Sequence, residues 1–295
     1  MSEETLLAKL NKVIEDLLKS ARLENLRKEL KKSIMKELTR LSCREWQREL
    51  VAERIRDIIR GELLLGRHVV VLEAKLGSPG IVGMGSGVLA TVLEVGLAWD
   101  YVVDLPLISG SAFKGAFRDT VIQLCARKAE DKLKCLEEVI ALLGRSAGAG
   151  DAEDIAKVLE VDSESVRNIV RGSASRGLLV FHDTYLICGE SGKLLEGWVI
   201  TPHYEKAGNE YEVKTVPVQH VVLASGLYGV FIVGVDVSAL NHISKLRELL
   251  GEGSCSGKTC LAFLSHILAA TLASGVGART SRGYTQFGVV RVYVR

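Results

Sequence analysis

The chain has 295 residues, of which 47% are hydrophobic and 25% charged, and its formal net charge at pH 7 is +2. This length allows one large domain or two ordinary ones, with enough apolar residues for a packed core. A charge this small excludes a protein that coats DNA, so any nucleic-acid surface must be a local patch. There is no apolar run long enough to span a membrane and no signal-peptide pattern, and we expect a cytoplasmic protein.

Residues 3–65 carry apolar side chains at three- and four-residue spacing with charges between them, which predicts helices. We favour a solvated helical bundle for this segment and leave partner binding open. Residues 67–76, RHVVVLEAKL, predict a strand, and residues 77–87 a glycine-rich loop. The apolar run over 88–100 is expected to be partly extended.

Residues 104–129 predict a turn that becomes a helix, with Ser109 or Ser111 placed to cap it. Lys114 and Arg118 lie one turn apart on one face of that helix. Residues 130–176 predict more helices, and residues 177–187 predict a strand. Residues 197–224 predict a hairpin excursion with an irregular tip.

The C-terminal part predicts a strand over 227–237, a helix over 258–274 and a last strand over 287–295. Without the insertions, the order is strand, helix, strand, strand, helix, strand. This order is ferredoxin-like (RRM-like), with an antiparallel sheet and two helices on one face. We therefore predict an α+β protein with a helical N-terminal extension over 1–65 and a core over 66–295. Within the core we expect a helical insertion over about 120–176 and a hairpin excursion over about 197–224.

The loop before the last strand reads GVGARTSRGYTQFG, residues 275–288. Glycine allows a backbone to approach a ligand closely, arginine grips phosphate with a planar fork, and tyrosine offers a face for a base. We weigh an anionic, base-bearing ligand and an ordinary mobile surface turn about equally for this loop.

Six cysteines stand at positions 43, 125, 135, 188, 255 and 260, without a Cys-x-x-Cys pair. In a reducing cytosol we expect buried or free thiols. Asn, Gln and Met are sparse whereas Lys, Arg and Glu are plentiful, as is typical of thermophiles, in which a disulfide such as Cys255–Cys260 becomes possible.

Three short motifs are similar to known ligand-binding patterns but match them poorly. GEGSCSGKT (251–259) is similar to a P-loop, but Glu252 replaces its first glycine and a helical segment precedes it. Cys255, Cys260 and His266 have no obvious fourth ligand for zinc. Residues 152–172 have helix-turn-helix spacing but only two arginines in the second helix. We expect no cofactor and no metal.

His182 and His203 are the histidines best placed to act as the base of a metal-independent ribonuclease. A lone histidine at a strand end is more often a hydrogen-bonded structural residue. Asp183 does not form a dyad with His182, because neighbours in a strand point to opposite faces.

Several segments, in order, resemble the RAMP superfamily, the repeat-associated proteins of CRISPR systems. They are GIVGMGSGVLATVLEVGL, LPLISGSAFKGAFRD, RGSASRGLLVFHD, ITPHY and GVGARTSRGYTQFG. The resemblance covers residues 67–295 and narrows to a subunit of the type III-B, or Cmr, effector complex.

The resemblance implies a non-catalytic RNA-binding subunit in the backbone of such a complex. It would hold the 3′ part of the guide RNA and its target duplex in antiviral defence, with guide RNA, target RNA and other RAMP subunits of the Cmr complex as partners. The target-cutting subunit has an aspartate in the loop after its first strand, whereas this chain has only Glu94 as an acid between Gly77 and Trp99.

On this basis we expect Lys114, Arg118, Arg279 and Arg282 to form one basic patch on guide-RNA phosphates. The backbone N–H groups of Gly110, Ser111, Gly275 and Gly277 would approach the same phosphates, and His203 and Tyr204 would lie near a base. The helices of 1–65 and 120–176 would dock neighbouring subunits.

Two alternatives remain. The first is a metal-independent RAMP endoribonuclease that processes CRISPR repeat RNA, with His203 or His182 as its base. The second is a helix-turn-helix regulator that binds duplex DNA through residues 152–172.

Overall fold

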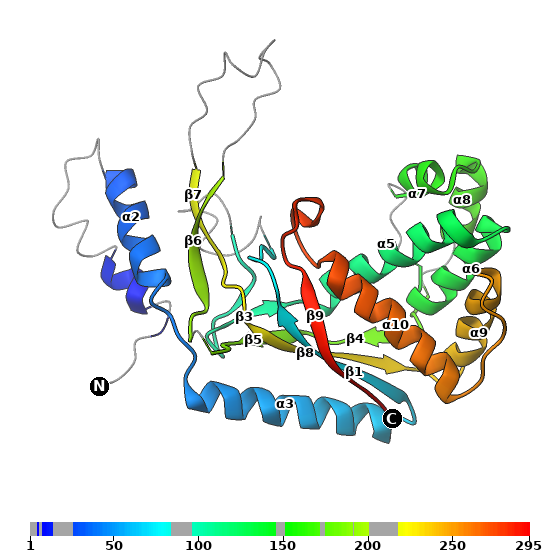
Figure 1. The fold of residues 1–295 in the computed structure, drawn as a ribbon, viewed down its shortest axis with the longest axis horizontal. Helices are drawn as coiled ribbons and strands as arrows, with labels where there is room; N and C mark the ends of the chain where they lie inside the picture. The colour runs from blue at the N-terminus through cyan, green and yellow to red at the C-terminus, as the bar shows by residue number, and fades with distance from the viewer. Residues whose placement is uncertain are drawn as a thin grey trace, which may run out of the picture.

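The computed structural model describes residues 5, 8–13, 26–83, 96–145, 151–171, 175–190, 192–200 and 218–295. A seven-stranded sheet runs through its centre in the order β2-β3-β5-β8-β1-β9, with β4 also paired to β8 (Figure 1). Every pairing is antiparallel. The strands are β1 (His68–Leu76), β2 (Trp99–Asp100), β3 (Leu105–Ile108), β4 (Leu179–Phe181), β5 (Thr184–Ile187), β8 (Tyr228–Val235) and β9 (Phe287–Val294).

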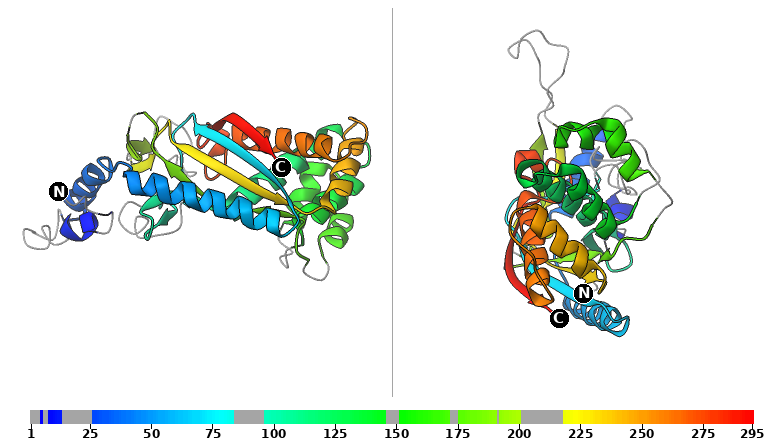
Figure 2. Two further views of the ribbon diagram at one scale, coloured as in Figure 1. Left: turned by 90° about the horizontal axis from the view of Figure 1, so that it is seen from below. Right: turned by 90° about the vertical axis from the view of Figure 1, so that its right-hand side faces the viewer.

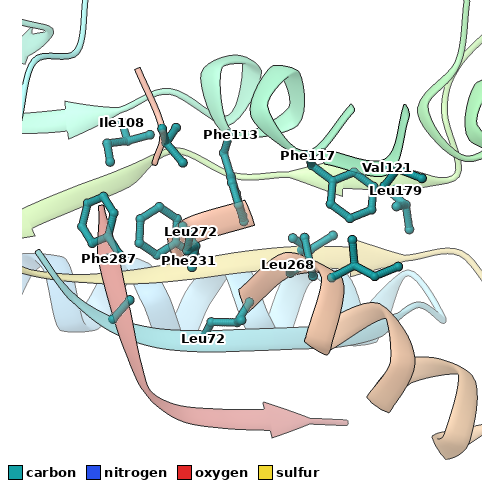
Figure 3. Close-up of a cluster of buried hydrophobic side chains, with 14 of the residues drawn as sticks. Leu72, Ile108, Phe113, Phe117, Val121, Leu179, Phe231, Leu268, Leu272 and Phe287 are labelled. Carbon is teal, nitrogen blue, oxygen red and sulfur yellow. The ribbon is translucent and has the colours of Figure 1, made fainter. Parts of the chain in front are cut away.

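One face of the sheet is covered by two helices, α5 (Gly110–Lys128) and α10 (Lys258–Ser274). Figure 3 shows Phe113 and Phe117 of α5 pointing towards Phe231 of β8 and the leucines of α10. The rings of Phe113 and Phe231 meet edge to face at 5.0 Å, and those of Phe231 and Phe287 at 5.2 Å. Fully buried aromatic side chains supply much of the apolar area that holds such layers together.

The opposite face of the sheet is covered by α3 (Glu45–Leu64), which runs along β1 and β8 (Figure 2). Ile55, Ile58 and Ile59 pack on Val69 and Val71. Both faces of β1 are therefore buried, which explains its almost continuous apolar sequence.

The expectation of a solvated N-terminal bundle is wrong. The isoleucine stripe of α3 has the three- and four-residue spacing of an amphipathic helix, but its partner is the valine-rich face of the sheet. The preceding helix, α2 (Leu26–Leu38), contacts the separate hairpin of β6 (Leu195–Ile200) and β7 (Val218–Leu223).

Three helices lie in the segment predicted as a helical insertion and gather at one end of the molecule (Figure 1). A fourth helix packs beside them, and its His242 Nδ1 lies 2.6 Å from Glu138 Oε2. The four are α6 (Lys132–Leu143), α7 (Ala152–Leu159), α8 (Ser163–Val170) and α9 (Ala239–Leu249).

The predicted hairpin excursion is present at its base as β6 and β7, while residues 201–217 lie outside the described residues. Two local predictions need correction. The turn predicted to open the segment from Asp104 is mostly strand β3, because Leu105 and Ile108 are buried and β3 pairs with β2 on one side and β5 on the other. The single strand predicted over 177–187 is interrupted at His182 and Asp183.

The expectation of unpaired thiols is also wrong, because all six cysteines are paired, and the Cys255–Cys260 disulfide considered possible from the sequence is present. The disulfides are Cys43–Cys188, Cys125–Cys135 and Cys255–Cys260, with Cα–Cα distances of 5.7, 5.9 and 5.1 Å. These distances lie within the usual range for disulfides. The first bond fixes the segment before α3 to the end of β5. Among the described helices, none is long and apolar enough to cross a membrane.

Candidate functional site

Four cationic side chains surround a cavity of about 470 Å³ beside the N-terminal half of α5. Lys114 and Arg118 come from α5, as their spacing predicts. Arg145 and Arg176 come from two loops on the other side of the cavity. Gly110 and Ser111 also line it. The cavity therefore combines a helix start with four cations, an arrangement suited to an anion.

The start of α5 is fixed by hydrogen bonds and by the lack of a side chain at Gly110. Ser109 caps the helix, since its Oγ accepts from the Ala112 N–H at 3.2 Å. A Cβ on residue 110 would lie 2.1 Å from the Phe181 carbonyl oxygen, so only glycine fits. The Gly110 N–H donates to Asp183 Oδ1 at 2.7 Å. That N–H was expected to approach a phosphate but already has a protein acceptor, whereas Ser111 stands exposed in the first turn.

Lys114 is a half-buried cation of this cavity. Burial, and then the neighbouring Arg118, lower the pKa of Lys114. Within the described chain it has no ion-pair partner, whereas Arg118 Nη1 lies 2.8 Å from Asp151 Oδ2. A bound anion would relieve the repulsion between the two cations.

Arg145 and Arg176 were missed in the sequence. They lie close together because the two loops cross at Gly144 and Gly177. A Cβ added at Gly144 would lie 2.4 Å from a backbone atom of the other loop, and one added at Gly177 would lie 2.5 Å from a backbone atom of the first. An isolated bridge joins Gly144 to Arg176. The only signal for it in the sequence is an arginine beside a glycine in both loops.

The glycine-rich loop at the C-terminus is a structured connection and not a free surface turn. Its residues bond to the chain after β1: the Ala278 N–H donates to the Ile81 carbonyl at 2.8 Å, and the Ile81 N–H donates to Thr285 Oγ1 at 2.9 Å. Gly275 and Gly277 have φ of +106° and +126°. A Cβ at Gly277 would lie 2.5 Å from the Ile81 oxygen, so the protein's own backbone requires this glycine.

The four expected cations are thus divided between two places. Arg279 precedes the 3₁₀ turn of the glycine-rich loop, η2 (Thr280–Arg282), and Arg282 ends it; neither lines the cavity beside α5. Near them, Tyr284 meets Trp198 of β6 edge to face at 6.3 Å, so the loop also carries a pair of aromatic rings.

The two histidines and the two cysteines considered for catalysis or zinc binding have different surroundings. His182 Nε2 lies 3.0 Å from Oε1 of the buried Glu62, which also binds Arg67 at 2.9 Å. His182 thus contacts α3, while Asp183 contacts Gly110, so the two point to different neighbours as expected. His203 and Tyr204 lie outside the described residues. Cys255 and Cys260 are joined in a disulfide, and the described residues contain no cluster suited to a metal.

The RAMP superfamily model matches residues 73–287. The CRISPR system CMR subunit Cmr6 of Saccharolobus solfataricus is 24% identical over 272 residues, covering 90% of this chain and 75% of that protein. A chain in the cryo-EM structure of the type III-B Cmr-beta complex bound to cognate target RNA has the same fold, with a TM-score of 0.58 at 16% identity, covering 93% of this chain and 77% of that chain. The crystal structure of Cmr6 from Pyrococcus furiosus aligns with a TM-score of 0.37 at 20% identity, over 76% of this chain and 98% of that one.

Proposed function

The chain belongs to the RAMP superfamily and resembles Cmr6, and from this premise we propose that it is a non-catalytic, RNA-binding backbone subunit of a type III-B CRISPR complex. Its partners would be guide RNA, target RNA and other RAMP subunits. It would hold the 3′ part of the guide and its target duplex in antiviral defence.

The observation that carries this proposal is the cavity with Lys114, Arg118, Arg145 and Arg176 around the start of α5. Cations contact RNA phosphates through charge and shape and read little sequence, as a guide of variable sequence requires. Arg279, Arg282 and the ring pair of Trp198 and Tyr284 would form a second contact for the strand, with His203 and Tyr204 near a base.

The fold supports the same proposal. The strand order β9-β1-β8, continued by β4 and β5, with α5 and α10 on one face, supports the proposal that the core is ferredoxin-like. The chain from Asp151 to Arg171 has six acidic and three basic residues, which disfavours duplex DNA as the ligand of α7 and α8.

A non-catalytic role is supported by the position of His182. Its ring bonds to Glu62 and so helps to hold α3 on the sheet. The alternative, a metal-independent endoribonuclease, would then depend on His203. Incubation of the purified chain with CRISPR repeat RNA in EDTA tests it directly, because site-specific cleavage would establish the enzyme.

The binding proposal is tested in a reconstituted complex by a Lys114→Ala/Arg176→Ala variant. Retention of guide RNA is measured against salt concentration. Because each phosphate contact contributes roughly 0.7 to 0.9 to the slope of log K against log salt, the double variant should flatten the slope by roughly 1.4 to 1.8.

The matched control is Arg127→Ala/Lys258→Ala, which removes two exposed cations that do not line the cavity. Its slope should equal that of the wild type. A Lys114/Arg176 variant that retains RNA with an unchanged slope would show that this cavity is not the RNA contact.

A further inference from the structure

A second, larger groove lies on the other face of the sheet, between α3 and the strands. Its volume is about 800 Å³. Helix α3 covers β1 and β8, but the groove continues to β9, where Tyr293 and Arg295 line it. Most of its lining is aliphatic: Ala52, Ile55, Ile59, Leu63, Leu64, Val69, Val71 and Val230.

Strand β9 is an edge strand, since β1 is its only partner among the described strands. Its exposed side chains are mostly apolar: Val290 is 57% exposed, Val292 43% and Tyr293 44%. Arg291 is the single charged residue of its eight. Proteins usually protect such an edge with charges or proline, so an apolar edge of this length indicates a surface that is normally covered.

The register shows which backbone groups of this edge have no partner. Val69 and Arg295 exchange hydrogen bonds of 2.9 and 3.0 Å in both directions. Because such pairs alternate along an antiparallel ladder, Tyr293 is bonded to Val71 in the same way, and the N–H groups of Val292 and Val294 point away from β1. These outward groups can accept one more strand.

The groove also has a positive charge. Arg56, Arg60 and Arg295 line it, and none of the three forms an ion pair with a carboxylate in the part of the chain that the structure describes. Glu73 is the single acidic residue of the lining. An occupant with carboxylates is therefore favoured over a neutral or basic one.

We propose that the groove and the outer edge of β9 dock an extended segment of a partner protein, which pairs with β9 as an additional strand and whose groove-facing side chains are partly apolar and partly acidic. Every second side chain of such a strand would enter the groove, the apolar ones against Leu63, Leu64 and Tyr293 and the acidic ones beside the three arginines, and the others would face away. The aliphatic lining disfavours RNA, which needs aromatic rings or cations in series. The proposal does not rest on RNA binding, because the cavity beside α5 lies on the opposite face of the sheet.

The probe is the fluorescein-labelled octapeptide Val-Ser-Glu-Ser-Val-Ser-Glu-Ser, whose valines and glutamates share one face of a strand, titrated with the full-length chain and followed by fluorescence anisotropy. We expect binding that weakens with salt. An Arg56→Glu/Arg60→Glu variant should raise the dissociation constant at least tenfold, whereas Arg127→Glu, an equally exposed arginine on α5, should leave it unchanged. Equal binding of the same peptide with lysine in place of glutamate, or competition by a uridine oligonucleotide, would overturn the proposal.

Strand addition is tested separately by Val292→Pro. Proline is tolerated on an edge strand where its N–H faced solvent, but it removes a donor that the added strand needs. It should abolish peptide binding while Val292→Ala retains it, and the peptide should slow hydrogen exchange at the Val292 and Val294 amides. Unprotected amides in the bound state, or a dimer of the free chain joined through β9, would refute the proposed docking mode.

Discussion

The Cys43–Cys188 disulfide should stabilise this protein more than either of the other two. It closes a loop with a sequence separation of 145, whereas Cys255–Cys260 closes one of 5. In the chain-entropy model, loops of these lengths destabilise the unfolded state by about 5 and about 2 kcal/mol, respectively. Replacing both members of the long-range pair by alanine should therefore cost about 3 kcal/mol more than the same change at the short-range pair.

The two pairs are well matched, because each has one buried and one half-buried cysteine. The free energy of unfolding is measured for wild type and both double variants in guanidinium under oxidising conditions, with near-UV circular dichroism to show that each variant is folded. Equal losses for the two pairs would refute the reasoning from loop length. A fully reduced wild type that unfolds at the same denaturant concentration as the oxidised one would refute the stabilisation itself.

Two further predictions follow from local geometry. Gly110→Ala should destabilise the protein strongly, because its Cβ would meet the Phe181 oxygen, whereas Gly115→Ala on the same helix has nothing within 4 Å and should stabilise it by about 0.5–1 kcal/mol; chemical denaturation of both variants checks this. Burial, followed by the hydrogen bond to Asp100, raises the pKa of Tyr185 from 10.0 to about 12. The neutral phenol is thus favoured in the folded state, so its contribution to stability is present below pH 10 and is lost as the pH rises towards 12. Tyr185→Phe should make unfolding less pH-dependent in this window, and an unchanged pH profile would contradict the shift.

Sequence periodicity predicted the helices and strands of the core because each carries its own pattern. It could not assign a partner to the isoleucine stripe of α3, since a bundle helix and a helix on a sheet have the same spacing. The cation pair of Lys114 and Arg118 was visible because one helical turn joins its members.

Other features depend on distances that no local pattern encodes. Arg145 and Arg176 become neighbours only through the glycine crossing, and Cys43 and Cys188, with a sequence separation of 145, pair only because the fold brings them together. The glycines of the C-terminal loop were predicted to let the backbone approach a ligand, whereas Gly277 closely approaches the protein's own Ile81.

The position of β1 has a consequence for how the chain is made. This strand is the first of the large sheet, yet its two partners are the last two strands of the chain, and β8 begins only at Tyr228. At a synthesis rate of about 5–20 residues per second, β1 waits roughly 8–30 s on the ribosome before its first partner exists. The centre of the sheet must therefore form late, through contacts of high sequence separation, and its valine-rich strand has to be shielded from aggregation until then.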